Sequence, residues 1–334
     1  MGMNVAVVGA TGAVGEAMLS ILEQRNFPVN EIFPLASSRS AGKSVVFNGR
    51  SLEVGRLDEF DFSTVELGLF SAGGSVSAEY APKATAAGCI VVDNTSYFRN
   101  DPEIPLIVPE VNLHALDQHQ GIIANPNCST IQMVVALKPI YDAVGIHRIN
   151  VATYQAVSGA GRRAIEELAG QTAALLNGKK PAIEVMPKQI AFNVIPEIDS
   201  FQDNGYTREE MKMVWETRKI LEDDSLMLNP TAVRVPVFYG HAEAIHLETR
   251  APIDAEQVKQ LLADAPGVTL YEGAEQFPTQ VSSASGNDSV HVGRVRNDIT
   301  HPCGLNLWVV SDNIRKGAAT NSIQIAETLI QDYL

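Results

Sequence analysis

The first third of the chain carries short, continuous runs of apolar residues, each followed by a turn that contains glycine, serine or asparagine. Such runs predict strands that are buried on both faces, as in a parallel sheet. We assign strands to Asn4–Val8, Glu31–Ser37, Val65–Ser71 and Cys89–Asp93. Apolar residues recur at helical spacing after the first strand, and Ser77–Ala87 also has a helical pattern. Strands that alternate with helices predict a Rossmann-like domain.

The pattern changes after residue 128. A strictly alternating segment, Asn150–Val157, predicts a strand with one exposed face. Helices are predicted at Arg162–Asn177, Thr207–Leu221, Asp254–Leu262 and Gly317–Leu334. Further strands are predicted at Thr231–Val237, Ala244–Thr249, Ser289–Arg296 and Leu305–Val310. This part of the chain is therefore predicted to be an α+β domain with a mixed, mostly antiparallel sheet.

The predicted fold class is α/β, with two domains. A Rossmann-like domain with a parallel sheet spans residues 1–128, and the C-terminal helix, 314–334, is expected to return to it. The α+β domain spans residues 129–313 and includes a proline-containing excursion, Gly178–Ser200. The chain has 334 residues, which is enough for two well-buried cores.

Charge and cysteine content exclude several classes of protein. The formal net charge of −14 argues against nucleic acid or an anionic membrane as a partner, because both need a basic face. The three cysteines, Cys89, Cys128 and Cys303, form no close pair, so we expect neither a disulfide framework nor a metal site. No apolar run has the length of a membrane span, and no signal peptide is evident, so a cytoplasmic protein is expected.

A glycine-rich turn, Gly9–Gly15, lies between the first strand and the first helix. Glycines in this position let the backbone approach a pyrophosphate, and the helix start favours its negative charge. At the end of the second strand, where an NAD enzyme places a carboxylate, the chain has Ser37-Ser38-Arg39-Ser40. A guanidinium there is suited to a 2′-phosphate, so NADP is the predicted cofactor. Arg99 follows the end of another predicted strand, a position suited to binding an anionic group. The alternative is a surface arginine with no ligand.

Cys128 follows the turn Asn125-Pro126-Asn127 and precedes a helical apolar pattern, so we expect it at the start of a helix. That position favours the thiolate and offers N–H groups to an oxyanion. A small buried cysteine is the alternative, and the polar neighbours Asn127 and Ser129 argue against it.

A nucleophilic cysteine beside a nicotinamide cofactor suggests oxidation of an aldehyde through a thioester. Such chemistry needs an acid or base, and His241, in a glycine-containing turn between two strands, is the best candidate among the seven histidines. His246 is a weaker one. Glu210 is explained as half of a capping box, whereas Glu209 and Lys212 have no such structural role.

These motifs occur together and in order, and with them the chain resembles the aspartate-β-semialdehyde dehydrogenase family. The resemblance extends from Asn4 to the final helix. The segments that carry it are Gly9–Gly15, Asn125–Thr130, Tyr154–Gly161 with Gln155, Arg234–Val237 and Gly240-His241. The cysteine motif and the spacing of Arg234 and His241 are its specific parts.

The resemblance implies that L-aspartate 4-semialdehyde, phosphate and NADP⁺ interconvert with L-aspartyl 4-phosphate and NADPH, in the biosynthesis of lysine, threonine, methionine, isoleucine and diaminopimelate. It also implies a homodimer formed through the second domain. Cys128 matches the thioester-forming nucleophile, His241 the acid/base and Gln155 the residue that orients the substrate. The substrate-binding positions implied are Arg234 for the α-carboxylate, Glu209 for the ammonium, Arg99 and Lys212 for phosphate, and Asn127. The cofactor-binding positions implied are Gly9, Thr11, Gly12, Ala13, Val14, Ser37, Arg39, Ser40, Ser158, Gly159 and Asn313.

Other functions remain open at this stage. A related reductase of N-acetylglutamyl phosphate would act on a substrate without a free ammonium, which would leave Glu209 without a role. A phosphate-independent aldehyde dehydrogenase would turn over without phosphate. A non-catalytic paralogue would have no physical reason to keep Cys128, Gln155, Arg234 and His241 together.

Overall fold

The computed structural model describes residues 2–273 and 276–332. These residues form two compact units. The first unit comprises Met1–Pro126 together with Ala318–Leu334, and the second comprises Asn127–Gly317. The last two residues of the predicted C-terminal helix lie outside the described residues.

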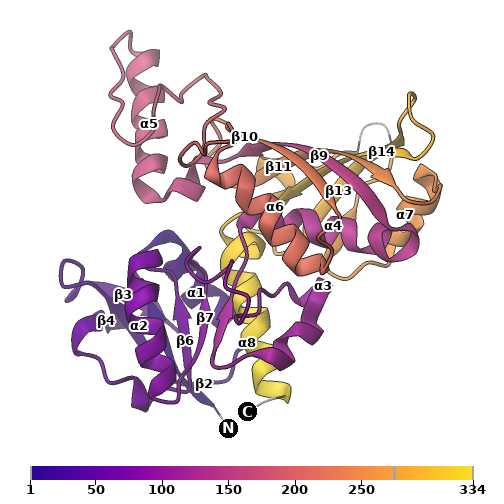
Figure 1. Ribbon diagram of the computed structural model, residues 1–334. Coiled ribbons are helices and arrows are strands. Elements are labelled where there is room, and N and C mark those ends of the chain that lie inside the picture. Colours follow the sequence, from indigo (N-terminus) through magenta and orange to yellow (C-terminus); the bar gives the residue numbers. More distant parts are fainter. Residues whose placement is uncertain (1, 274–275, 333–334) are drawn as a thin grey trace. The chain divides into compact units, whose positions relative to one another are not determined.

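The first unit contains a six-stranded sheet in which every neighbouring pair is parallel, as predicted. Its order is β5-β2-β1-β6-β7-β8 (Figure 1). The strands are β1 (Met3–Val8), β2 (Val29–Ala36), β5 (Gly55–Arg56), β6 (Leu67–Phe70), β7 (Ile90–Asp93) and β8 (Ile122–Ala124). The chain leaves β1 toward β2 and later returns to the other side of β1 for β6. Open α/β sheets bind ligands at the carboxyl ends of the strands beside such a reversal.

Helices of the first unit bury their apolar faces against this sheet. They are α1 (Ala13–Gln24), α2 (Gly74–Ala86) and α8 (Thr320–Asp332), and the short α3 (Pro109–Asn112) packs against α8. The helix α8 shares one core with β1 and α1, because Ile323 and Leu329 are fully buried in the same cluster as Val5 and Met18. Short 3₁₀ turns cover Leu57–Glu59, Phe62–Thr64 and Leu113–Gln118.

A small hairpin in the first unit was not predicted. Its strands, β3 (Ser44–Phe47) and β4 (Arg50–Glu53), pair antiparallel across Asn48-Gly49. Both turn residues have positive φ, 48° and 70°, as a type I′ turn requires. The Asn-Gly pair was a local signal for this hairpin, but the flanking strands are too short for a clear apolar alternation.

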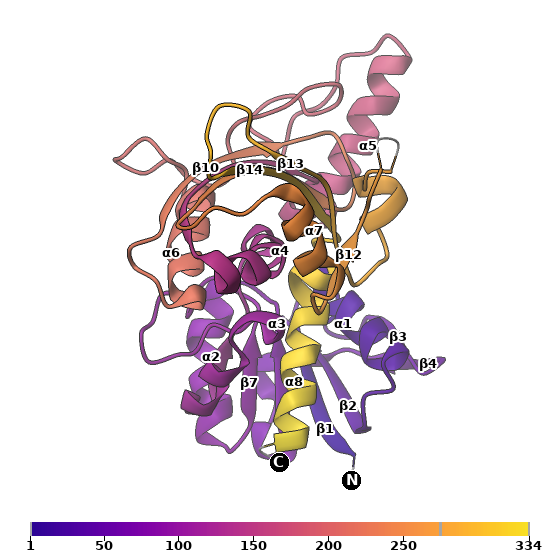
Figure 2. The ribbon, with the colours of Figure 1, turned by 90° about the vertical axis from the view of Figure 1, so that its right-hand side faces the viewer.

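The second unit contains a mixed sheet of six strands, as predicted, in the order β10-β9-β11-β14-β13-β12. The outer pairs are parallel and the inner pairs antiparallel. The strands are β9 (Ile146–Gln155), β10 (Met227–Arg234), β11 (His241–Thr249), β12 (Val268–Leu270), β13 (Val290–Asn297) and β14 (Gly304–Ser311). Figure 2 shows this sheet as a curved layer above the helices α4 (Cys128–Val144) and α7 (Ala255–Ala263).

The helix α6 (Arg208–Leu221) packs beside α4 and β10 in the same unit. It begins with the predicted capping box, in which the Thr207 side chain accepts from the Glu210 amide and the Glu210 side chain accepts from the Thr207 amide. The helix α5 (Arg162–Leu176) packs with the following excursion in a separate small core that contains Leu168, Ile190 and Ile195. The remaining short turns are Val157–Ala160, Gln280–Ala284 and Arg315–Ala319.

Two strand boundaries near the candidate site differ from the prediction. The strand predicted over Thr231–Val237 ends at Arg234, and the strand predicted to begin at Ala244 begins at His241. His241 is therefore a strand residue and does not lie in the turn. The cause is Gly240, whose φ of +85° lets the chain reverse immediately before His241, so that pairing with Gln155 on β9 starts there.

No helix in the described part of the chain is long and apolar enough to cross a membrane.

Candidate active site

Cys128 is the first residue of α4, as predicted. Asn127 caps this helix, and its side-chain oxygen accepts hydrogen bonds from the amides of Ser129 at 3.0 Å and Thr130 at 3.3 Å. The cap fixes the first turn and places the sulfur at the positive end of the helix. Gly317 leaves room for the cysteine, because a Cβ at that position would lie 2.9 Å from the Cys128 Cβ.

Three polar side chains converge on the carboxylate of Glu209, which is 6% exposed. Its Oε1 accepts from Asn127 Nδ2 at 2.9 Å and from Gln155 Nε2 at 3.1 Å. Its Oε2 accepts from Lys212 Nζ at 3.0 Å. Glu209, Lys212 and Asn127, which the resemblance assigned to substrate binding, thus form one hydrogen-bonded network, and Asn127 also caps the nucleophile's helix.

The charge state of this network follows from its hydrogen bonds. Burial alone would raise the pKa of Glu209, but Lys212 and the amides of Asn127 and Gln155 outweigh it and lower the pKa to about 2. Burial likewise opposes the charge of Lys212, whereas Glu209 and Asp199 raise the pKa of its ammonium. Glu209 is therefore an ionised carboxylate and Lys212 a cation at neutral pH.

Arg234 and His241 meet around the backbone of Ala156. Arg234 Nη1 donates to the Ala156 carbonyl oxygen at 2.8 Å, and His241 Nδ1 accepts from the Ala156 amide at 3.0 Å. A Cβ at Gly159 would lie 3.1 Å from Arg234 Nη1 and 3.4 Å from His241 Nε2, so both side chains face this glycine. Burial lowers the pKa of Arg234, while Glu209 and Cys128 act in the opposite direction. The guanidinium therefore feels the charges of both groups.

The second unit thus brings together Cys128, Gln155, Glu209, Lys212, Arg234 and His241, with Asn127. Arg99 lies in the first unit, 7% exposed, where its guanidinium donates to the Asn94 carbonyl oxygen at 2.9 Å. It is held by the loop that follows β7.

The glycine turn of the first unit fits a pyrophosphate group. Gly9 has a φ of +91°, and Gly12 caps α1 without a side-chain hydrogen bond, so the first amides of α1 have no side-chain cap. A Cβ at Gly15 would lie 2.2 Å from the Gly9 carbonyl oxygen, so only glycine allows this close packing of turn and helix. Ser37 and Arg39, at the end of β2, are exposed.

Ser158 and Asn313, assigned to the cofactor by the resemblance, are hydrogen-bonded to each other in the second unit at 3.0–3.1 Å. The Asn313 Oδ1 also accepts from the Gly240 amide at 2.9 Å. Asn313 therefore fixes the two turns that precede His241 and follow Gln155.

Sequence reasoning missed several residues that support the site. Asp199 Oδ2 accepts from Lys212 Nζ at 2.8 Å, and Glu216 Oε2 accepts from the Asn127 amide at 2.6 Å. Glu209, Lys212 and Glu216 are spaced by three and seven residues on α6, which was a helical-face signal. Asp199 carried no sequence signal, because it lies in the irregular excursion.

A second buried carboxyl group, Glu243, lies two residues after His241 on β11 and is fully buried. Burial raises its pKa well above the usual value, and the facing amide of Gln132 offsets this only in part. Neither carboxyl oxygen forms a hydrogen bond of standard geometry with a described residue. Burial therefore favours the protonated form of Glu243 in the folded protein.

We expect Glu243→Gln to raise the melting temperature, and to raise it more at pH 8 than at pH 5. The unfolded chain releases the Glu243 proton above its ordinary pKa, whereas the folded chain holds it, so the wild type loses stability as pH rises. A neutral amide of the same shape removes that loss. We expect a gain of about 1.4 kcal/mol for each pH unit over which only the unfolded chain is ionised at this position. Calorimetry at both pH values measures it, with the partly exposed Glu248→Gln as control. An equal change at both pH values would contradict a protonated Glu243.

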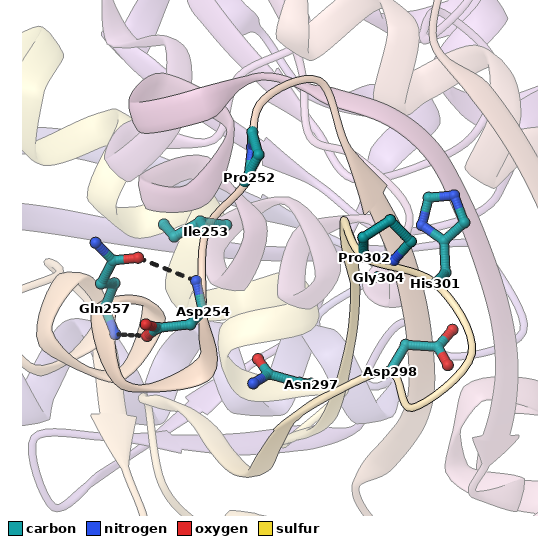
Figure 3. Close-up of a pocket in the computed structure, with 9 residues that line it drawn as sticks. All are labelled: Pro252, Ile253, Asp254, Gln257, Asn297, Asp298, His301, Pro302 and Gly304. Carbon is teal, nitrogen blue, oxygen red and sulfur yellow. Dashed lines mark hydrogen bonds between the residues drawn. The ribbon is translucent and has the colours of Figure 1, made fainter.

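A polar surface pocket of the second unit carries no candidate chemistry (Figure 3). Its polar groups complete local structure. Asp254 and Gln257 form the capping box of α7, Asn297 accepts from the Ala255 amide, and Asp298 pairs with His246 and Thr300. None of the residues of the Cys128 site lines it.

Comparison with known proteins agrees with this architecture. Residues 4–119 match the family model described as semialdehyde dehydrogenase, NAD binding domain, and residues 137–316 match the model described as semialdehyde dehydrogenase, dimerisation domain. The chain is therefore an oxidoreductase with a nicotinamide-dinucleotide-binding domain.

Individual relatives show which family of semialdehyde dehydrogenases the chain resembles. Aspartate-semialdehyde dehydrogenase of Legionella pneumophila is 65% identical over 336 residues, which cover 99% of this chain and 97% of the relative. Aspartate-semialdehyde dehydrogenase 2 of Vibrio cholerae is 65% identical over 99% of this chain and 98% of its own length. The structure of the Vibrio cholerae enzyme II complexed with ASA matches with a TM-score of 0.99 at 64% identity, with 100% of both chains covered. The chain belongs to the aspartate-semialdehyde dehydrogenase family.

A more distant structure is relevant to the cofactor. Aspartate semialdehyde dehydrogenase with NADP from Candida albicans matches with a TM-score of 0.78 at 26% identity, with 99% of both chains covered.

Proposed function

We propose that the chain catalyses the phosphorylating, NADP-dependent oxidation of L-aspartate 4-semialdehyde to L-aspartyl 4-phosphate, and the reverse reduction in cells, through a thioester on Cys128. The charge pattern of the second unit is the observation that carries this proposal. A buried guanidinium interacts electrostatically with an ionised carboxylate and with a cysteine at a helix start. The substrate has a carboxylate that can pair with the guanidinium, an ammonium that can pair with the carboxylate, and an aldehyde that the cysteine can attack.

Each residue has a role in this proposal. Arg234 binds the α-carboxylate, for which a guanidinium offers two parallel donors, and Glu209 binds the ammonium. Cys128 attacks the carbonyl carbon as a thiolate, and His241 serves as the acid/base. The relative whose structure was determined with ASA supports the choice of substrate.

Gln155 and Asn127 hold Glu209 in place through the hydrogen bonds to its Oε1, and so orient the ammonium of the substrate. Lys212, with Arg99 from the first unit, is proposed to bind phosphate, which then displaces the sulfur from the thioester. Lys212 has the charge for this role, but Glu209 and Asp199 already bind its ammonium, so phosphate must compete with Asp199.

The proposed cofactor is NADP, bound by Gly9, Thr11, Gly12, Ala13 and Val14 of the glycine turn, by Ser37, Arg39 and Ser40, and by Ser158, Gly159 and Asn313. When bound, the nicotinamide supplies the hydride acceptor. The lack of a carboxylate at the end of β2 supports NADP over NAD, and the Candida albicans relative with NADP agrees with it.

We expect Arg39→Ala to raise the KM for NADP⁺ by roughly 10–100-fold and to leave the KM for NAD⁺ within about twofold. A hydrogen bond to a charged group is worth about 1.5–3 kcal/mol, and only NADP has the 2′-phosphate that would lose it. Initial rates with each cofactor measure the effect. Arg50→Ala, another exposed arginine of the first unit, is the matched control. Equal losses with both cofactors would show that Arg39 does not read the 2′-phosphate.

The function itself is tested by following the absorbance of reduced nicotinamide with aspartate semialdehyde and NADP⁺, with and without phosphate. Reduction that depends on phosphate supports the proposal. Reduction without phosphate would instead indicate a hydrolytic aldehyde dehydrogenase. If no reduction occurs in protein that is folded and binds NADP, N-acetylglutamyl phosphate is the next substrate to assay, although the buried Glu209 has no partner on it.

We further propose a homodimer formed through the second unit. The match to a dimerisation domain over residues 137–316 supports it. Exposed aromatic side chains of the same unit also support it. Tyr154, whose ring lies 5.5 Å from that of Trp308, is partly exposed, and Phe238 and Phe277 are exposed as well. Light scattering tests the assembly state.

A further inference from the structure

Lys212 is held by two carboxylates that differ in how accessible they are. Its Nζ lies 3.0 Å from Glu209 Oε2 and 2.8 Å from Asp199 Oδ2. Glu209 is buried, and its other oxygen is bound by Asn127 and Gln155. The side chain of Asp199 is 36% exposed, and that of Lys212 is 15% exposed. Asp199 is therefore the partner that an anion from solvent can displace from the ammonium.

The backbone around Asp199 is fixed, although it belongs to no regular helix or strand. Asp199 has a φ of +68°, in the left-handed region that aspartate and asparagine tolerate better than most residues. Before it, Ile195 exchanges two backbone hydrogen bonds with the last residue of β10, at 2.8 and 2.9 Å. After it, the Ser200 carbonyl oxygen accepts from the Arg208 amide at 2.7 Å, and the Ser200 amide donates to Asp199 Oδ1 at 2.8 Å. These contacts hold the carboxylate in place before any ligand binds.

The charges around Lys212 cancel when Asp199 is ionised. Burial opposes the charge of Asp199, as does the nearby Glu209. The hydrogen bonds from Lys212 and the Ser200 amide outweigh both and lower the pKa of Asp199. Glu209 also interacts with the guanidinium of Arg234, so two cations face two carboxylates in the second unit. Without the Asp199 charge this set would carry a net positive charge, which favours an anion.

We propose that Asp199 competes with phosphate for the Lys212 ammonium and thereby limits the affinity of the enzyme for phosphate. This inference rests on the proposed function, in which Lys212 binds phosphate. An arriving phosphate either displaces the Asp199 carboxylate or binds beside its negative charge, and both lower the affinity. In the reductive direction phosphate is the product, and the same competition favours its release. Asp199 acts only through Lys212 in this proposal.

Asp199→Asn isolates the charge, because asparagine has the same shape, tolerates the left-handed backbone and keeps an oxygen for the Ser200 amide. We expect the KM for phosphate to fall by about 3–10-fold, because a competing, partly exposed charge is removed. The KM for the semialdehyde and for NADP⁺ should stay within about twofold of the wild type. Asp203→Asn removes an exposed charge from the same segment and should change none of the three constants. A carboxylate that only positions Lys212 for phosphate would give a higher KM for phosphate in Asp199→Asn, and a higher or unchanged value would overturn the proposal.

Calorimetric titration of inorganic phosphate into the full-length protein gives a readout that does not depend on turnover. Asp199→Asn should bind phosphate more tightly than the wild type, and the difference should shrink at high ionic strength, because salt screens partly exposed charges. The gain should vanish when Lys212→Met is added, since the competition requires the ammonium. Equal affinities of Asp199→Asn and the wild type, or a gain that persists with Lys212→Met, would contradict the proposal. Because the wild-type assay with and without phosphate tests the proposed function alone, failure of either claim is recognised separately.

Discussion

Cys128→Ser is expected to lower kcat by about 10⁴-fold or more, while the affinity for NADP stays within about twofold of the wild type. A hydroxyl at this helix start remains protonated at neutral pH, and no thioester can form from it. The side chain is close in size, so the cap from Asn127 to the amides of Ser129 and Thr130 should persist. Steady-state rates in both directions and a cofactor titration measure the two quantities.

Cys303→Ser is the matched control, since Cys303 is also partly buried in the second unit. It should leave kcat unchanged. Cys89 is unsuited to the nucleophile's role, because burial raises the pKa of its thiol to about 12. If Cys128→Ser kept most of the activity, the covalent mechanism would have to be abandoned.

Arg234→Ala is expected to lower kcat/KM for the semialdehyde by roughly 10²–10⁴-fold. Removal of one partner from a buried, hydrogen-bonded charge pair costs about 2–5 kcal/mol, and the substrate carboxylate would be left without its guanidinium. The KM for phosphate and for NADP⁺ should change little. Arg234→Lys retains the charge without the bidentate geometry and should lie between the variant and the wild type.

The Arg234 variants also lose the hydrogen bond to the Ala156 carbonyl, so thermal unfolding must accompany the kinetics. A variant that is folded and loses affinity for phosphate instead of the semialdehyde would move Arg234 from the carboxylate site to the phosphate site. Partial recovery of Arg234→Ala by added guanidinium ion would locate the defect at the missing group.

Much of the site was predictable because its signals are local. The glycine turn after β1 and the cap Asn127 before Cys128 each depend on residues a few positions apart, and the capping box of α6 depends on Thr207 and Glu210 alone. Apolar periodicity likewise predicted the parallel and mixed sheets. The hairpin at Asn48-Gly49 also had a local signal, and was missed because its strands are short.

The partners of the site residues were not predictable, because they depend on strand register and on how helices pack. Asn127 contacts Glu209 across 82 positions and Glu216 across 89. Asp199 reaches Lys212 from an irregular excursion that has no periodicity. The strand β11 starts at His241 because Gly240 has a positive φ, and the pattern of apolar residues does not predict that backbone angle.

The sequence by itself thus determined which helices and strands form and which residues lie at their ends, because apolar periodicity and helix capping act between near neighbours. Only the tertiary structure decided the charge and the hydrogen-bonding direction of those residues. Glu209 is ionised because three donors surround it, whereas burial without such donors raises the pKa of Glu243. His241 Nδ1 accepts from the Ala156 amide, 85 positions away, because strand register places that amide beside it. Desolvation and long-range contacts determine the charge and the hydrogen bonds of these residues, and the local sequence pattern predicts neither of them.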